Sequence, residues 1–90
     1  MTTYYVILWE TVIDEAGENG VHGVYTSREE ADAAFAEAVE EEKEWVADQW
    51  GWTIDADHKD YFSASEDGWY SGNHTELKIC VVNQDNAAIQ

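Results

Sequence analysis

The sequence contains no proline, one cysteine and only four basic residues, and each of these scarcities excludes a class of structure or function. Cys80 alone permits no intrachain disulfide, so a disulfide scaffold is excluded. The longest apolar run, Tyr4 to Trp9, falls far short of the roughly 20 residues that a transmembrane helix needs. Residues 1–4 lack the basic and apolar regions of a signal peptide. We therefore expect a soluble chain in a reducing cytoplasm.

The scarcity of basic residues produces an extreme net charge. Twenty Asp and Glu residues against four Lys and Arg give a formal charge of −16 at pH 7. Such a surface repels phosphate backbones and anionic lipids, and it attracts cationic surfaces over a Debye length of about 8 Å at physiological salt. The charge therefore argues against direct binding to nucleic acid or to a membrane, and it favours a basic partner.

The length and apolar content predict one folded domain over residues 1–90. Ninety residues is below the usual size at which a chain divides into two cores. The hydrophobic fraction of 44%, with five Trp, five Tyr and two Phe, is ample for a globular core despite the charge. We expect the tail, residues 84–90, to fray.

Alternating apolar residues predict four strands, over residues 4–13, 21–25, 61–66 and 75–83. Both faces of the first segment are largely apolar, which is typical of a central strand. The polar cluster at 14–20 predicts a long acidic hairpin loop. Asp55, Asp57 and Asp60 are placed in another loop.

A helix start is indicated by Ser27 followed three residues later by Glu30, the pattern of a capping box. The helical pattern continues to Trp50 and stops at Gly51. The predicted fold class is α+β, with an antiparallel four-stranded sheet in the chain order β-β-α-β-β and one long helix packed on one face.

The acidic residues of this helix gather on one side. At 100° per residue the apolar stripe expected to face the sheet is well separated from an arc of carboxylates about 60° wide. The apolar stripe comprises Ala31, Ala34, Phe35, Ala38, Trp45, Val46 and Gln49. The acidic ridge comprises Glu30, Glu37, Glu41, Glu44 and Asp48, with Glu29 and Glu40 at its margin.

The spacing along the acidic ridge suits the imitation of a phosphate row. From Glu37 onward its members follow at four, three and four residues, or about 4.5 to 6 Å at 1.5 Å rise per residue. Phosphates on one nucleic-acid strand are spaced by about 3.4 Å along the helix axis and further apart through space. Like charges four residues apart cost a few tenths of a kcal/mol per pair, yet only Lys43 interrupts the run. A plain solvated helix face and halophilic adaptation are the competing interpretations.

Glu42 falls near the middle of the apolar stripe. A carboxylate there is either buried with a raised pKa, or it lies at a wet edge of the sheet or accepts a hydrogen bond from a nearby Tyr or Trp. The second alternative is favoured because isolated buried acids are rare.

The sequence gives little support for a metal or catalytic site. Asp55, Asp57 and Glu66 match the first, third and twelfth positions of a calcium loop, but Lys59 and Asp60 break the motif. The three His residues and Cys80 have no recognised zinc spacing, and apolar neighbours indicate an inert thiol. We expect no cofactor, no metal and no enzymatic activity. The histidines are His22, His58 and His74.

Trp69 and Tyr70 lie in a turn flanked by Gly68 and Gly72. Aromatic residues on a turn are often exposed, and Trp and Tyr are frequent hot spots of interfaces. They are added to the acidic ridge as candidate partner-binding residues.

In size, charge and its ridge from Glu30 to Asp48, the chain resembles the small acidic proteins by which phages and mobile elements block host defence, the anti-CRISPR and anti-restriction DNA mimics. This resemblance implies an inhibitor that occupies the basic nucleic-acid groove of an effector protein. The alternative is a non-catalytic interaction or accessory domain whose acidity serves solubility, as a homodimer joined through a strand edge or an aromatic patch.

Overall fold

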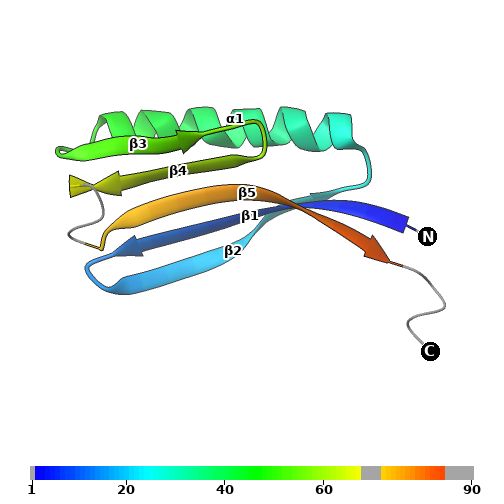
Figure 1. Ribbon diagram of the computed structural model, residues 1–90, viewed down its shortest axis with the longest axis horizontal. Coiled ribbons are helices and arrows are strands. Elements are labelled where there is room, and N and C mark those ends of the chain that lie inside the picture. The colour runs from blue at the N-terminus through cyan, green and yellow to red at the C-terminus, as the bar shows by residue number, and fades with distance from the viewer. Residues whose placement is uncertain (1, 68–71, 85–90) are drawn as a thin grey trace.

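The computed structural model describes residues 2–67 and 72–84, which form a five-stranded antiparallel sheet and one helix (Figure 1). The strand order in the sheet is β2-β1-β5-β4-β3, so the first and last strands of the described chain lie side by side. The elements are β1 (Thr2–Ile13), β2 (Ala16–Tyr25), α1 (Arg28–Ala47), β3 (Trp52–Asp57), β4 (Tyr61–Glu66) and β5 (His74–Gln84).

The predicted four-stranded sheet is wrong, because β3 occupies the segment that was assigned to a loop. This strand pairs only with β4 and forms one edge of the sheet, where polar side chains face solvent without cost. Its apolar anchor is Trp52, whose ring packs edge-on against Trp45 of the helix with centroids 4.9 Å apart. Aspartates are unfavourable in strands, so the aspartates of this segment indicated a loop, although Trp52 attaches the segment to the core as a strand.

The hairpin between β1 and β2 is also tighter than predicted. Asp14 and Glu15 both have positive φ, 52° and 69°, and they form a two-residue turn. The side-chain oxygen of Asn73 accepts a hydrogen bond from the Asp14 backbone N–H at 2.8 Å. The predicted long loop at 14–20 is therefore wrong, and most of it belongs to β2.

Helix α1 begins as predicted, because the Ser27 side chain accepts a hydrogen bond from the Glu30 backbone N–H at 3.3 Å. It ends at Ala47, three residues earlier than predicted, and Gly51 adopts a left-handed conformation with φ of 83°. Within residues 2–67 and 72–84, no helix is both long enough and apolar enough to cross a membrane.

The core lies between α1 and one face of the sheet. Most of the predicted apolar stripe is buried there, and Val39 joins it. Odd-numbered residues of β1 and β5 and even-numbered residues of β4 point toward the helix. The buried cluster comprises Ile7, Phe35, Ala38, Val39, Val46, Phe62, Ala64 and Leu77.

The opposite face of the sheet has no second layer in the part of the chain that the structure describes. The Cα atoms span 49 × 26 × 15 Å, the dimensions of an elongated plate. Val21, Val24 and Val82 are exposed on this uncovered face, next to residues of β1 such as Val6 and Leu8.

Both edge strands contain a bulge. Ile7 pairs with Gly23 while Leu8 pairs with Val21, so His22 of β2 has no partner in the register. In β3 the register skips Asp55 in the same way. A bulge bends its strand and increases the local twist.

Candidate functional site

The acidic ridge of α1 is fully exposed. All six carboxylate side chains in the candidate set, Glu30, Glu37, Glu40, Glu41, Glu44 and Asp48, are solvent-exposed. Among the described residues, Glu40 alone of this set lies within ion-pair distance of a basic side chain, 3.7 Å from Lys43. The ridge therefore presents a row of carboxylates, most of which have no basic side chain of the described residues within ion-pair distance.

A hollow of about 430 Å³ extends from the acidic ridge toward the β1–β2 hairpin. Glu41 and Glu42 of the helix and Glu18 of β2 contribute carboxylates to its lining, and Trp9 and Trp45 contribute indole rings. The remaining lining residues are Thr11, His22, Ala38 and Leu77. We call this hollow the acidic groove.

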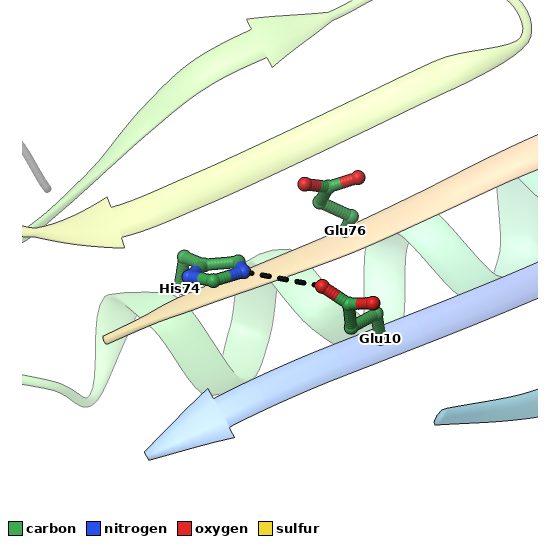
Figure 2. Close-up of side chains that lie close together, drawn as sticks. All are labelled: Glu10, His74 and Glu76. Atoms are coloured by element: carbon green, nitrogen blue, oxygen red, sulfur yellow. Dashed lines mark hydrogen bonds and ion pairs between the residues drawn. The ribbon is translucent and has the colours of Figure 1, made fainter. Parts of the chain in front are cut away.

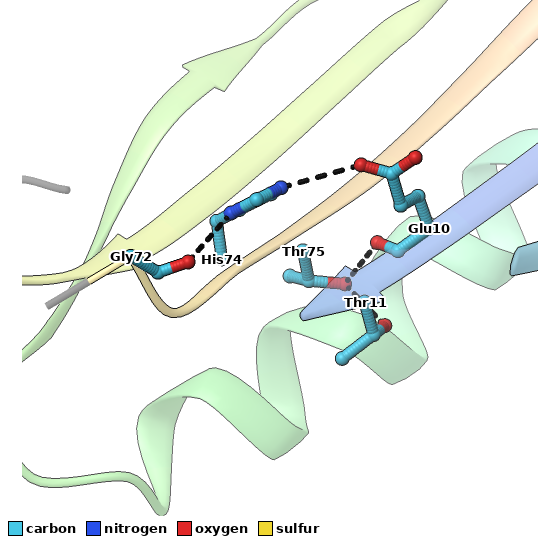
Figure 3. Close-up of polar contacts among 5 residues, drawn as sticks. All are labelled: Glu10, Thr11, Gly72, His74 and Thr75. Atoms are coloured by element: carbon cyan, nitrogen blue, oxygen red, sulfur yellow. Dashed lines mark hydrogen bonds and ion pairs between the residues drawn. The ribbon is translucent and has the colours of Figure 1, made fainter. Parts of the chain in front are cut away.

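Glu42 is half-buried, and its hydrogen-bond donor is the hydroxyl group of Thr75, not the Tyr or Trp that was one of the expected alternatives. Its Oε1 accepts a hydrogen bond from the Thr75 hydroxyl at 3.0 Å. The Thr75 oxygen in turn lies 3.0 Å from the Thr11 hydroxyl, which is drawn in Figure 3. Thr75 has one proton to donate, so the short contacts form a chain from Thr11 through Thr75 to Glu42. This chain orients Glu42 at the floor of the acidic groove.

Three of the four basic residues, Arg28, Lys43 and Lys59, lie on the other flank of the helix. Lys43 Nζ lies 2.8 Å from Asp57 Oδ2, and the hydrogen bond with Asp57 raises the pKa of this lysine above its ordinary value. Arg28 and Lys59 both contact Asp32, at 2.8 and 3.8 Å. The lining of the acidic groove contains no Lys or Arg. The helix thus separates two flanks of different charge.

The three aspartates that were assigned to a loop, Asp55, Asp57 and Asp60, lie on and next to β3. Asp55 Oδ2 accepts a hydrogen bond from Ser65 Oγ at 2.6 Å, and Asp57 pairs with Lys43. Two of the three are thus strand residues committed to contacts with neighbouring elements. Asp60 follows β3 in the turn, and its carbonyl oxygen accepts from the Ile79 backbone N–H at 3.0 Å.

A third group of side chains lies on the uncovered face of the sheet, where β1 and β5 bring Glu10, His74 and Glu76 together (Figure 2). One candidate ligand atom from each residue lies within 4.8 Å of the other two. His74 Nε2 lies 3.3 Å from Glu10 Oε1. We call this group the Glu–His–Glu cluster.

Sequence reasoning missed this cluster because its members are 64 residues apart and only the β1–β5 register joins them. One local signal was present. In a strand, His74 and Glu76 necessarily share one face because side chains alternate.

Trp69 and Tyr70 lie outside the described residues, so their predicted role in an interface is untouched by the structure. Cys80 is partly buried on the uncovered face, opposite Val6 of β1. Comparison of the chain with protein-family models, curated proteins and solved structures found no match.

Proposed function

We propose that the protein is a non-catalytic inhibitor that binds a basic, nucleic-acid-binding effector protein by imitating phosphate charge, in the manner of anti-CRISPR and anti-restriction mimics. The observation that carries this proposal is the exposed acidic ridge, whose carboxylates are not neutralised by the fold. A row of like charges on one helix destabilises that helix. Its retention is explained if the charges serve a partner.

The acidic groove supports the same proposal and adds chemistry to it. A Lys or Arg side chain of a partner fits an environment with carboxylates from Glu18, Glu41 and Glu42. Trp9 and Trp45 supply apolar surface and aromatic faces to its methylene stem and cationic head. The ridge would steer the partner, and the groove would hold one of its basic side chains.

The test compares two variants that have the same net charge. The ridge variant replaces Glu37, Glu41 and Glu44 by Gln and Asp48 by Asn. The control variant makes four matching changes at exposed positions away from the acidic ridge. These are Asp14→Asn, Glu15→Gln, Asp60→Asn and Asp67→Asn.

The immobilised parent protein should capture basic nucleic-acid-binding proteins from a host-cell lysate at low salt, and duplex DNA should compete with it for each purified captured protein. The ridge variant should associate at least about ten-fold more slowly, because steering depends on where the charges lie. The control variant should associate like the parent. Equal losses in both variants, or no competition by DNA, would contradict the proposal.

The uncovered face of the sheet favours a second candidate function, an interaction domain that self-associates. Val21, Val24 and Val82 expose about half of their surface there, at 58%, 56% and 46%. Such side chains on one face are typical of a surface that another molecule covers. Val24→Lys would then convert a dimer to a monomer in sedimentation experiments, whereas phosphate mimicry by the acidic ridge does not depend on this face.

A further inference from the structure

The Glu–His–Glu cluster has the composition and the geometry of a metal-binding site, independently of the acidic ridge on the other side of the sheet. The His74 side chain is 15% exposed and the Glu10 side chain 48% exposed, and Glu76 is half-buried. The cluster is therefore largely shielded from solvent at the histidine and open to solvent at Glu10.

A backbone contact fixes the orientation of the His74 ring (Figure 3). Nδ1 lies 2.9 Å from the carbonyl oxygen of Gly72. A carbonyl oxygen only accepts, so Nδ1 must donate its proton to it. The left-handed conformation of Gly72, with φ of 81°, accompanies this contact. Metal-binding histidines are commonly fixed in this way by a hydrogen bond from their second nitrogen to a backbone carbonyl.

The other ring nitrogen of His74, Nε2, then faces an acceptor. Glu10 Oε1 lies 3.3 Å away, and an ionised carboxylate has no proton to donate. Two acceptors at this distance repel each other unless a cation lies between them. A metal ion bound to both atoms meets this requirement.

The carboxylates impose the same requirement. Glu10 and Glu76 lie directly opposite each other in the β1–β5 register, and like charges in that position are destabilising. Lys78 lies two residues along β5 on the same face, but its ammonium is not within ion-pair distance of any carboxylate among the described residues. The pair lacks a lysine or arginine counter-charge in this part of the chain.

The distances identify the class of metal. Two donors bound at 2.0–2.1 Å in a tetrahedron lie about 3.3 Å apart, which matches the separation of His74 Nε2 and Glu10 Oε1. A carboxylate oxygen of Glu76 lies within 4.8 Å of both of these atoms. A mixed set of one imidazole and two carboxylates suits Zn²⁺ and similar divalent transition metals better than Mg²⁺ or Ca²⁺, which prefer oxygen ligands alone.

We propose that Glu10, His74 and Glu76 bind a divalent transition-metal ion of the Zn²⁺ class, through His74 Nε2 and one oxygen of each carboxylate. Three protein ligands leave a coordination position for water or for a group from another molecule. A hollow of about 280 Å³ next to the cluster, lined in part by Glu10, Glu76 and Lys78, gives access to that position. The ion joins β1 to β5 and neutralises the repulsion between the two carboxylates.

The experiment uses the full chain after treatment with a chelator. Titration with Zn²⁺, followed by calorimetry, should give one site per chain, and Mg²⁺ at the same concentration should not compete for it. Glu10→Gln, His74→Gln and Glu76→Gln should each weaken Zn²⁺ binding by at least about ten-fold, because each removes a ligand. Zn²⁺ should also raise the melting temperature of the parent protein, because it binds only the folded chain at this site.

The matched control is His58→Gln, which removes an exposed histidine remote from the cluster and should leave Zn²⁺ affinity unchanged. The two exchanges at Glu10 and Glu76 keep the test informative if the His74 variant folds poorly. If the parent binds no Zn²⁺, the cluster is a histidine–carboxylate ion pair only and the proposal fails. Equal affinities of the His74 and His58 variants would overturn it as well, because the binding would then be diffuse.

Discussion

Lys43 Nζ and Asp57 Oδ2 lie 2.8 Å apart and join the helix to β3, the edge strand that the sequence did not reveal. Lys43 also contacts Glu40 at 3.7 Å, so one lysine serves two carboxylates. The hydrogen bond with Asp57 is the largest cause of the raised pKa of Lys43. The negative charges of the Asp57 and Glu40 carboxylates also raise it.

The first prediction is that Lys43→Met lowers the free energy of unfolding slightly, by loosening the contact between β3 and the helix. A pKa raised in the folded state means that this contribution is complete at neutral pH. It is lost only as the pH rises above 10.5, through the folded-state pKa. Urea unfolding of parent and variant should therefore differ at pH 7 and converge at strongly alkaline pH. Lys59→Met removes the same charge from a side chain that is 77% exposed and should have a smaller effect.

The second prediction concerns the hydroxyl chain beneath the acidic groove. Thr75 is 1% exposed, and Thr75→Val removes the donor to Glu42 from a site that water does not reach easily. We expect a loss of about 1–3 kcal/mol in the free energy of unfolding, measured by urea denaturation. Thr11→Val leaves the bond from Thr75 to Glu42 in place and should cost less. An equal or larger loss for the Thr11 variant would refute this account of the chain.

The third prediction tests the end of the helix. Gly51 has φ of 83°, and Gly51→Ala should cost about 1–2 kcal/mol because other L-residues avoid this conformation. Gly17→Ala is the matched control. Its added methyl group meets Val12 at an ordinary contact distance of 3.5 Å, and its φ is not in the left-handed region. Thermal unfolding should separate the two variants, and similar melting temperatures would contradict the prediction.

The fourth prediction is that the ridge variant is more stable than the parent, although it binds a partner more weakly. Removing four carboxylates relieves several like-charge contacts at three- and four-residue spacing, each worth a few tenths of a kcal/mol. The total gain should be about 1 kcal/mol at low ionic strength and should shrink as salt is added. A ridge variant that is less stable than the parent at low salt would show that these carboxylates stabilise the fold.

The sequence predicted the elements whose signals are local. Ser27 caps the helix as expected, and Phe35 and Val46 are buried as the helical periodicity indicated. The periodicity identified the sheet-facing stripe because burial of apolar surface dominates the packing of a helix on a sheet.

The sequence did not predict features that depend on tertiary context. Residues 52–57 form a strand because they pair with β4 and because Trp52 packs on the core, although aspartates are unfavourable in strands. The Asp14–Glu15 turn has no glycine, so nothing in its composition distinguishes two turn residues from seven.

The two candidate sites also differ in whether the sequence alone could predict them. The acidic ridge is a property of one helix, and the helical spacing alone places its members together. The Glu–His–Glu cluster requires the pairing of Glu10 with Glu76, and no spacing within one segment encodes that register. Glu10 comes close to His74, 64 residues later in the chain, only after β1 has paired with β5.

The bulges at His22 and Asp55 have a consequence for behaviour at high concentration. A sheet with two open edges is prone to add strands from neighbouring copies and to grow into fibrils. Here each outer strand is interrupted by an extra residue, so neither offers a regular row of backbone groups to a second chain. We therefore expect the backbone itself to disfavour edge-to-edge polymerisation and to leave the broad faces and the helix as the surfaces for association.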